Sequence, residues 1–237
     1  MNKICLIRQS AGLGDIFFCQ KIGCYYKDRG YEIVWPVIKE FTWLSDYLDN
    51  FDYCSVDSDF IHKDSYTDLN NKAITDNDAF IFIPLHGHYL LDSSVMISKY
   101  RFVNIDHRDW ANYFNFKRNI NKENILFYDI LRLNDDSEYN FVNKIYASPP
   151  GVLENKYVKS SNELCDVELR LIDGFSIFDW CKVIENASNI YTVETSLNYI
   201  IDKLQIKAKD LHMYSKWSPP DYHHIDKLFT KKWNYIK

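Results

Sequence analysis

Short apolar runs alternate with amphipathic stretches along the first part of the chain. The runs Ile4–Ile7, Tyr31–Trp35 and Ala79–Pro84 are rich in apolar residues, as are the strands of a sheet that is covered on both faces. Between them, Ile16–Lys27 and Phe41–Leu48 carry apolar residues at helical spacing. This order of strand, helix, strand, helix and strand predicts a Rossmann-like half with a parallel sheet.

A polar, turn-rich stretch, Leu133–Glu138, separates this part of the chain from a second alternation. The strands expected after it are Tyr139–Tyr146, Val167–Ile172, Asn189–Val193 and Leu211–Tyr214, and the expected helices are Ser176–Ala187 and Thr195–Leu204. We expect the tail from Asp221 to be helical. The pattern therefore predicts an α/β protein with two Rossmann-like domains, residues 1–135 and 136–237.

The balance of residue types narrows the class of protein. Apolar residues make up 46% of the 237 residues and charged residues 26%, which is ordinary for a globular protein. The net charge of -5 disfavours nucleic acid as a partner, because a phosphate backbone binds basic surfaces. We expect no signal peptide and no transmembrane segment, because no apolar run approaches the roughly 18 residues of a membrane helix. The six cysteines include no Cys-x-x-Cys pair, so we expect reduced thiols and a cytoplasmic protein.

A glycine-bearing turn follows the first apolar run and opens the first expected helix. Gly12 and Gly14 allow the backbone to turn sharply and let a ligand approach closely. Ligands of open α/β sheets bind at the carboxyl ends of strands, where the first amides of a helix attract anions. Asp15 is then either a carboxylate that stabilises the start of the helix or a general base in a cleft. Arg8, at the end of the strand, is a candidate cation for a phosphate group.

A second polar turn lies between the expected strand Asn189–Val193 and the helix that follows it. It consists of Glu194, Thr195, Ser196 and Leu197. The turn could hold a phosphate on its backbone amides, or it could be an ordinary helix cap made by its two hydroxyl side chains. Further candidate cations for a diphosphate are Lys144, Lys156 and Arg170.

Two histidines follow the apolar strand Ala79–Pro84. His86 and His88 have the spacing of a zinc-ligand pair, but no third ligand stands at a telling distance along the chain. We therefore expect no metal site. The remaining interpretations are a substrate-binding residue in a cleft and a loop that merely follows a strand.

The first turn resembles a known family of enzymes. The segment Arg8–Ile22, followed by Gly30–Pro36, resembles the amino end of heptosyltransferase-like glycosyltransferases of family 9, which have the GT-B fold. The resemblance implies that Asp15 is the catalytic base that activates the acceptor hydroxyl. The family usually has a proline some residues into the first helix, where this chain has Gln20 and Lys21.

The second turn resembles the donor site of the same family. The layout of Asn186–Leu197 is similar to that of the family's carboxyl half, in which an acid and backbone amides hold the donor nucleotide sugar. Glu194 stands in place of an aspartate and Ser196 in place of a glycine. The resemblance implies that these two residues, with Thr195 and Leu197, bind the donor.

The resemblance also implies an architecture and a reaction. The architecture is a compact GT-B fold in which two Rossmann-like halves face a cleft, with the acceptor on the first half and the donor on the second. The reaction is the transfer of a sugar from a nucleotide sugar to a hydroxyl of a carbohydrate or glycan, with inversion and without a metal or other cofactor. One alternative is a GT-B-like or Rossmann-like protein that binds nucleotides or sugars without turnover. Another is a single-domain nucleotide-binding protein of the flavodoxin type.

Overall fold

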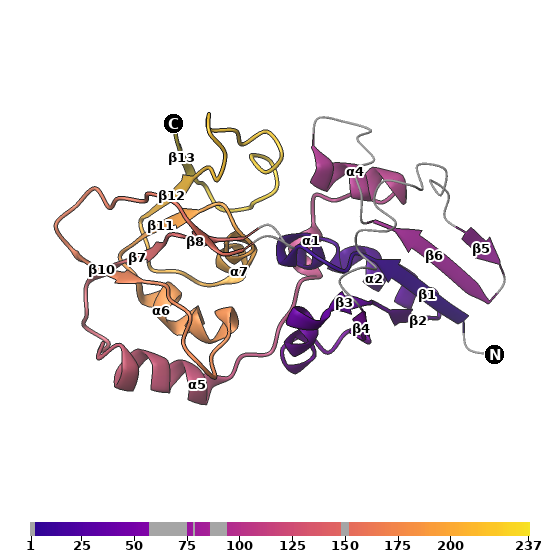
Figure 1. Cartoon of the computed structure of the whole chain (residues 1–237), viewed down its shortest axis with the longest axis horizontal. Coiled ribbons are helices and arrows are strands. Elements are labelled where there is room, and N and C mark those ends of the chain that lie inside the picture. The colour runs from indigo at the N-terminus through magenta and orange to yellow at the C-terminus, as the bar shows by residue number, and fades with distance from the viewer. Residues whose placement is uncertain (1–2, 57–74, 78, 86–93, 148–151) are drawn as a thin grey trace. The chain divides into compact units, whose positions relative to one another are not determined.

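The computed structural model describes residues 3–56, 75–77, 79–85, 94–147 and 152–237 (Figure 1). The chain divides into two compact units. The first comprises Met1–Lys117 with His223–Lys227, and the second comprises Arg118–Tyr222 with Leu228–Lys237. Each unit carries its own largely parallel sheet with helices, which confirms the expected α/β class with two Rossmann-like halves.

The sheet of the first unit has four strands in the order β2-β1-β6-β5. Their bounds are β1 (Lys3–Arg8), β2 (Tyr31–Val34), β5 (Thr75–Asn77) and β6 (Phe80–Pro84). Strand β1 lies parallel to β2 and β6, and β5 is an antiparallel edge strand. Arg8 is the register partner of Pro84, so β1 and β6 end side by side and the residues just after these strands share one edge of the sheet.

The helices of the first unit are short. Among the described residues they are α1 (Leu13–Phe18), α2 (Gln20–Lys27), α4 (Val95–Phe102) and the 3-10 helices η1 (Lys39–Asp46) and η2 (Trp110–Asn112). The unit also contains a small parallel pair, β3 (Val37–Ile38) and β4 (Ser55–Val56). The helix that we expected over residues 16–27 is two helices, because the backbone leaves the helical conformation at Cys19. Phe18 is fully buried and packs edge-on against Tyr100 from α4, with ring centroids 4.8 Å apart.

All neighbours in the five-stranded sheet of the second unit are parallel, in the order β10-β7-β11-β12-β13. The strands are β7 (Tyr139–Asn143), β10 (Cys165–Glu168), β11 (Asn189–Val193), β12 (Asp210–Tyr214) and β13 (Asn234–Ile236). Val193 is the register partner of Tyr214, and Thr192 is the partner of Asn143. The carboxyl ends of β7, β11 and β12 therefore lie at one edge.

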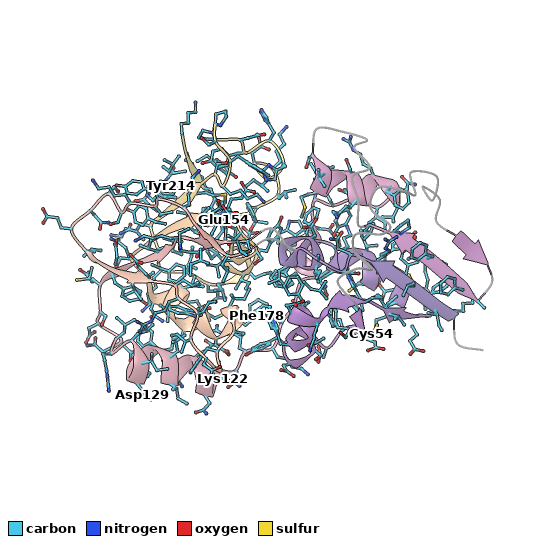
Figure 2. All side chains as sticks on the ribbon, in the orientation of Figure 1. Cys54, Lys122, Asp129, Glu154, Phe178 and Tyr214 are labelled. Carbon is cyan, nitrogen blue, oxygen red and sulfur yellow. The ribbon has the colours of Figure 1, made fainter. Side chains whose placement is uncertain are left out.

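The strand that we expected over residues 139–146 is interrupted. The Asn143 side chain accepts a hydrogen bond of 3.1 Å from the Ile145 amide, which turns the chain out of the sheet. The next two residues form β8 (Ile145–Tyr146), which pairs antiparallel with β9 (Glu154–Asn155). The Tyr146 hydroxyl donates to the carboxylate of Glu154, a residue labelled in Figure 2.

The helices of the second unit begin just after the division at Lys117. They are α5 (Ile120–Asn124), the π-helix η3 (Ile125–Ile130), the 3-10 helix η4 (Ile177–Trp180), α6 (Cys181–Asn186) and α7 (Leu197–Lys203). Arg118 donates to the buried carboxylate of Glu123 and also to Glu185, and Lys122 donates to the Gly174 carbonyl at 2.7 Å. Figure 2 labels Lys122 and the core residue Phe178. The polar stretch Leu133–Glu138, within which we expected the boundary at residue 135, is therefore a loop inside the second unit.

The carboxyl-terminal tail and the lengths of the helices complete the comparison with the expected elements. The tail that we expected to be helical from Asp221 consists of turns followed by strand β13. Within the described ranges, no helix is both long enough and apolar enough to cross a lipid bilayer.

Candidate functional site

The loop between β1 and α1 depends on one of its two glycines. Gly12 has φ of +79°, a conformation that side-chain-bearing residues rarely adopt, and a Cβ at this position would overlap the Oδ2 atom of Asp15. Gly14 lies inside the first turn of α1. Gly12 thus makes the turn that we expected from both glycines, and it also leaves room for the Asp15 carboxylate to fold back over the loop.

Asp15 lies at the carboxyl-end edge of the first sheet and is paired with a lysine that the sequence analysis did not single out. Its Oδ1 atom is 3.0 Å from Nζ of Lys99; the Asp15 side chain is 29% exposed and that of Lys99 is 6% exposed. The Lys99 ammonium also donates to the Leu85 carbonyl at 2.9 Å and to Oε1 of Gln9. The available sequence signal was a lysine in the middle of the otherwise mostly apolar stretch Val95–Tyr100.

Two further charged residues of the first unit, Arg8 and Asp106, differ in how they are held. Arg8 is buried at the end of β1, and its carbonyl accepts a hydrogen bond from the Leu85 amide at 3.0 Å. Asp106, another acid of this unit, receives hydrogen bonds from the side chain and the amide of Arg108. These hydrogen bonds hold the pKa of the Asp106 carboxyl far below its usual value, so Asp106 is a poor proton acceptor near neutral pH.

The next question is where the two candidate histidines lie and whether the described residues form a metal site. His86 and His88 lie outside the described residues. Among the residues that the structure does describe, no three His, Cys, Asp or Glu side chains converge in a way that could hold a metal ion. The acid that the structure places near the end of β1 is Asp15, which is partly exposed and paired with Lys99.

In the second unit, Glu194 follows β11 and is nearly buried. Its amide donates to the Tyr214 carbonyl at 2.9 Å, and its Oε1 atom is 3.6 Å from Nζ of Lys216. Lys216 stands two residues beyond the end of β12, and because β11 and β12 are parallel neighbours their succeeding residues meet. The sequence analysis missed Lys216, although a lysine just after the strand beside the second turn was a usable signal.

The rest of the second turn is held by its own side chains. Oγ1 of Thr195 accepts from the Leu197 amide at 3.2 Å, and Oδ1 of Asn198 accepts from the Thr195 amide at 2.7 Å. Ser196 is the residue before α7 and makes no side-chain capping hydrogen bond. Thr195 thus acts as the helix cap that the sequence analysis kept as an alternative, and the amides of Thr195 and Leu197 are both engaged within the turn.

Asn143 connects this turn to the neighbouring strand end. Its Nδ2 atom lies 3.1 Å from Oγ1 of Thr192 and 3.5 Å from Oγ1 of Thr195, and the Asn143 side chain is buried. The other expected cations have different partners: Lys144 pairs with Glu168, Lys156 donates to the Trp217 carbonyl, and Arg170 is exposed. Lys216 is the cation that the structure brings to Glu194.

Comparisons with known proteins identify the fold. No protein-family model and no curated protein matches the sequence. Among solved structures, the chain is similar to the glycosyl transferase family 9 protein from Veillonella parvula DSM 2008, with a TM-score of 0.57 and 11% identity over 100% of this chain and 87% of that chain. It also matches the iron-containing dodecameric glycosyltransferase TibC from enterotoxigenic E. coli H10407, with a TM-score of 0.45 and 9% identity over 90% of this chain and 58% of that chain. The similarity to the Veillonella protein confirms the expected resemblance at the level of the fold: the chain has the α/β architecture of a family 9, GT-B glycosyltransferase.

Proposed function

We propose that this protein is a glycosyltransferase that moves a sugar from a nucleotide-sugar donor to an acceptor hydroxyl, with inversion and without a metal ion. The observation that carries the proposal is the position of Asp15, a partly exposed carboxylate in the first turn of the helix that follows parallel strand β1, in a GT-B-like fold. A sugar hydroxyl is a poor nucleophile until its proton has an acceptor, and a positioned carboxylate supplies one. The acceptor is a carbohydrate or glycan, and the six free cysteines support a reducing, cytoplasmic setting.

The proposed step balances as a single displacement. The acceptor oxygen bonds to the anomeric carbon of the donor sugar while its proton passes to the Asp15 carboxylate. The bond between the anomeric carbon and the phosphate oxygen breaks, and the nucleoside diphosphate leaves with the electron pair. Because the hydroxyl attacks from the face opposite the leaving group, the configuration at the anomeric carbon is inverted.

The second unit supplies the donor side of the proposal. Glu194 is nearly buried and can accept hydrogen bonds from hydroxyls of the ribose or the sugar, as the resemblance to the family implies. Lys216, 3.6 Å from Glu194, is the cation that we assign to the leaving diphosphate. A cation at this place takes the charge-stabilising role that a metal ion has in other transferases. Thr195, whose hydroxyl accepts from the Leu197 amide, holds the turn after Glu194 in shape.

The test of the proposal is Asp15→Asn, compared with Asp49→Asn. Asn keeps the shape of the side chain and an oxygen for Lys99 but removes the basicity. We expect kcat for transfer to fall by at least ~10²-fold while the donor KM stays within about threefold. Asp49 is an exposed acid of the same unit that pairs with Lys117, so its variant controls for the loss of one carboxylate. A near-normal kcat for Asp15→Asn would reject Asp15 as the base.

The donor side has a separate test in Glu194→Gln, measured as nucleotide-sugar affinity by calorimetry. Each hydrogen bond to a charged group contributes about 1.5–3 kcal/mol, so we expect a loss of at least ~10-fold in affinity. Glu154→Gln is the matched control, because Glu154 is an exposed acid of the same unit whose partner is the Tyr146 hydroxyl. Equal donor affinity in the two variants would remove Glu194 from the donor site.

One observation favours the alternative of a binding protein without turnover. The Asp15 carboxylate is already engaged by a buried lysine, as a purely structural acid would be. A panel of nucleotide sugars separates the two functions. A binding protein would bind a donor and release no nucleotide from it, with or without an acceptor, whereas a transferase releases nucleotide as the acceptor is consumed.

A further inference from the structure

A buried ammonium gathers three parts of the first unit around the end of β1. Nζ of Lys99 lies 3.0 Å from Oδ1 of Asp15 and 2.9 Å from the Leu85 carbonyl, and it donates to Oε1 of Gln9. These partners come from the first turn of α1, the end of β6 and the end of β1. The Lys99 ammonium thus has two hydrogen-bond acceptors and one carboxylate at ion-pair distance.

The two neutral acceptors are themselves fixed. The Leu85 amide donates to the Arg8 carbonyl at 3.0 Å, which ties the ends of β6 and β1 together. The side-chain amide of Gln9 donates to the Ala11 carbonyl at 2.6 Å, and the backbone carbonyl of Gln9 accepts from the indole of Trp35 at 3.1 Å. These two acceptors therefore hold the Lys99 ammonium in place relative to the sheet without any contribution from the Asp15 carboxylate.

The charge on Lys99 is paired by a carboxylate that is not itself fully buried. Lys99 is 6% exposed and Asp15 is 29% exposed. Burial of an ammonium is unfavourable unless the charge is paired and hydrogen-bonded. The ion pair therefore stabilises the buried Lys99 and at the same time fixes the Asp15 side chain. One carboxylate oxygen faces Lys99, and the other lies over Gly12, where the absence of a Cβ leaves space for it.

We propose that Lys99 is a positioning residue that orients the Asp15 carboxylate toward the acceptor hydroxyl. The inference rests on the proposed transferase function and deepens it. Lys99 binds Oδ1 and so fixes the plane of the carboxylate, and Oδ2, over Gly12, receives the proton. Lys99 acts on the rate only through Asp15, and it takes no part in binding the donor.

The experiment is a double-mutant cycle of transfer kinetics. Lys99→Gln is measured in the natural background and together with Asp15→Asn. We expect Lys99→Gln alone to lower kcat by at least ~30-fold, with donor KM within about threefold, because loss of orientation acts on the reacting geometry. In the Asp15→Asn background, the same change is expected to lower kcat by less than about threefold. Lys117→Gln is the control, since Lys117 forms an exposed pair with Asp49 in the same unit.

The possible failures are distinguishable. Falls in kcat of equal size in both backgrounds, or an unchanged kcat in the natural background, would overturn the role of Lys99 even if Asp15→Asn is strongly impaired. A normal rate for Asp15→Asn alone would instead reject the proposed function. If circular dichroism shows that Lys99→Gln is unfolded, Lys99→Arg takes its place in the cycle. Arginine keeps the charge, but its planar guanidinium differs in shape from the ammonium and cannot make the same three contacts. We therefore expect a loss of ~10-fold that disappears with Asp15→Asn, and an unchanged kcat would overturn the proposal.

Discussion

Replacement of Gly12 by alanine tests the packing of the Asp15 carboxylate over the β1–α1 loop. Gly12 has φ of +79°, and a Cβ there would meet the Asp15 carboxylate. Gly30 has φ of +84°, and a Cβ there would meet nothing within 4 Å. The two positions therefore share the backbone strain of a left-handed alanine and differ in the overlap with the carboxylate, which makes Gly30→Ala a matched control.

The size of the effect comes from these two contributions. An alanine held in the left-handed region costs ~1–2 kcal/mol at either position. In Gly12→Ala, Asp15 must also move away from Lys99. Loss of a buried ion pair costs up to about 3–5 kcal/mol, and we take ~1–3 kcal/mol here because water reaches a carboxylate that is 29% exposed. We expect Gly12→Ala to lose ~2–5 kcal/mol of unfolding free energy and Gly30→Ala only ~1–2 kcal/mol.

The assay is urea unfolding followed by circular dichroism, with kcat measured on the same samples. The extra ~1–3 kcal/mol corresponds to a lower melting temperature by roughly 2–12 °C for a protein of this size. Gly12→Ala is also expected to lower kcat, because the carboxylate is displaced, while Gly30→Ala retains it. The reasoning is refuted if the two variants are equally destabilised. It is also refuted if the excess loss persists when Asp15→Ala is present in both, because the overlap then lies elsewhere.

Three further predictions concern other parts of the two units. Asp202→Ala is expected to lower the unfolding free energy by ~2–4 kcal/mol and to shift tryptophan fluorescence to the red, because the Asp202 carboxylate binds the amides of Thr230 and Lys231, close in sequence to buried Trp233. Asp210 is exposed, so Asp210→Ala should have neither effect. Burial lowers the pKa of His107 and His212, so the unfolded chain binds more protons than the folded protein and stability is lost as pH falls below about 6.5. In urea titrations from about pH 7.5 to 5.5, the variant with both histidines replaced by glutamine should lose less unfolding free energy than the natural protein. An equal loss in the two proteins would contradict this. Iodoacetamide at pH 8 should label exposed Cys165 first, since burial raises the pKa of Cys5 and Cys19 to about 12; mass spectrometry that finds either buried thiol alkylated before Cys165 would contradict the structure.

The fold was predictable where apolar runs reveal buried strands. The expected strands Ile4–Ile7 and Asn189–Val193 correspond to β1 and β11, because parallel strands covered on both faces leave an almost continuous apolar run. Strand β13 was not predictable. It lies parallel to β12, and the Asp202 carboxylate binds the amides of Thr230 and Lys231 just before it. Periodicity along the tail contains no trace of these partners, which are far away in the sequence.

The candidate site was predictable only in part, for a similar reason. Asp15 and Glu194 stand at strand-to-helix turns, and such turns can be recognised from local residue order. Lys99 and Lys216 left weaker signals, because residue order does not show which acid each lysine meets: Lys99 comes from a later helix, and Lys216 follows the neighbouring strand.

The position of the domain boundary was not predictable from turn residues. A turn-rich stretch such as Leu133–Glu138 marks a loop whether or not it separates two units. The structure places the division after Lys117, and the ion pair of Arg118 with Glu185 ties the start of α5 to α6 within the second unit. This contact joins residues far apart in sequence, so local composition carries no sign of it.

The path of the carboxyl-terminal segment limits how this protein can be recombined with its structural relatives. The chain passes from the first unit to the second after Lys117, returns to the first at His223 and enters the second again at Leu228. The returning segment carries the carbonyl of His224, which accepts from Ser94 at the start of α4, and the final stretch supplies edge strand β13. A chimera with a single crossover near residue 117 would therefore separate the first unit from its own segment His223–Lys227, and an exchange of the second unit alone needs three junctions in place of one.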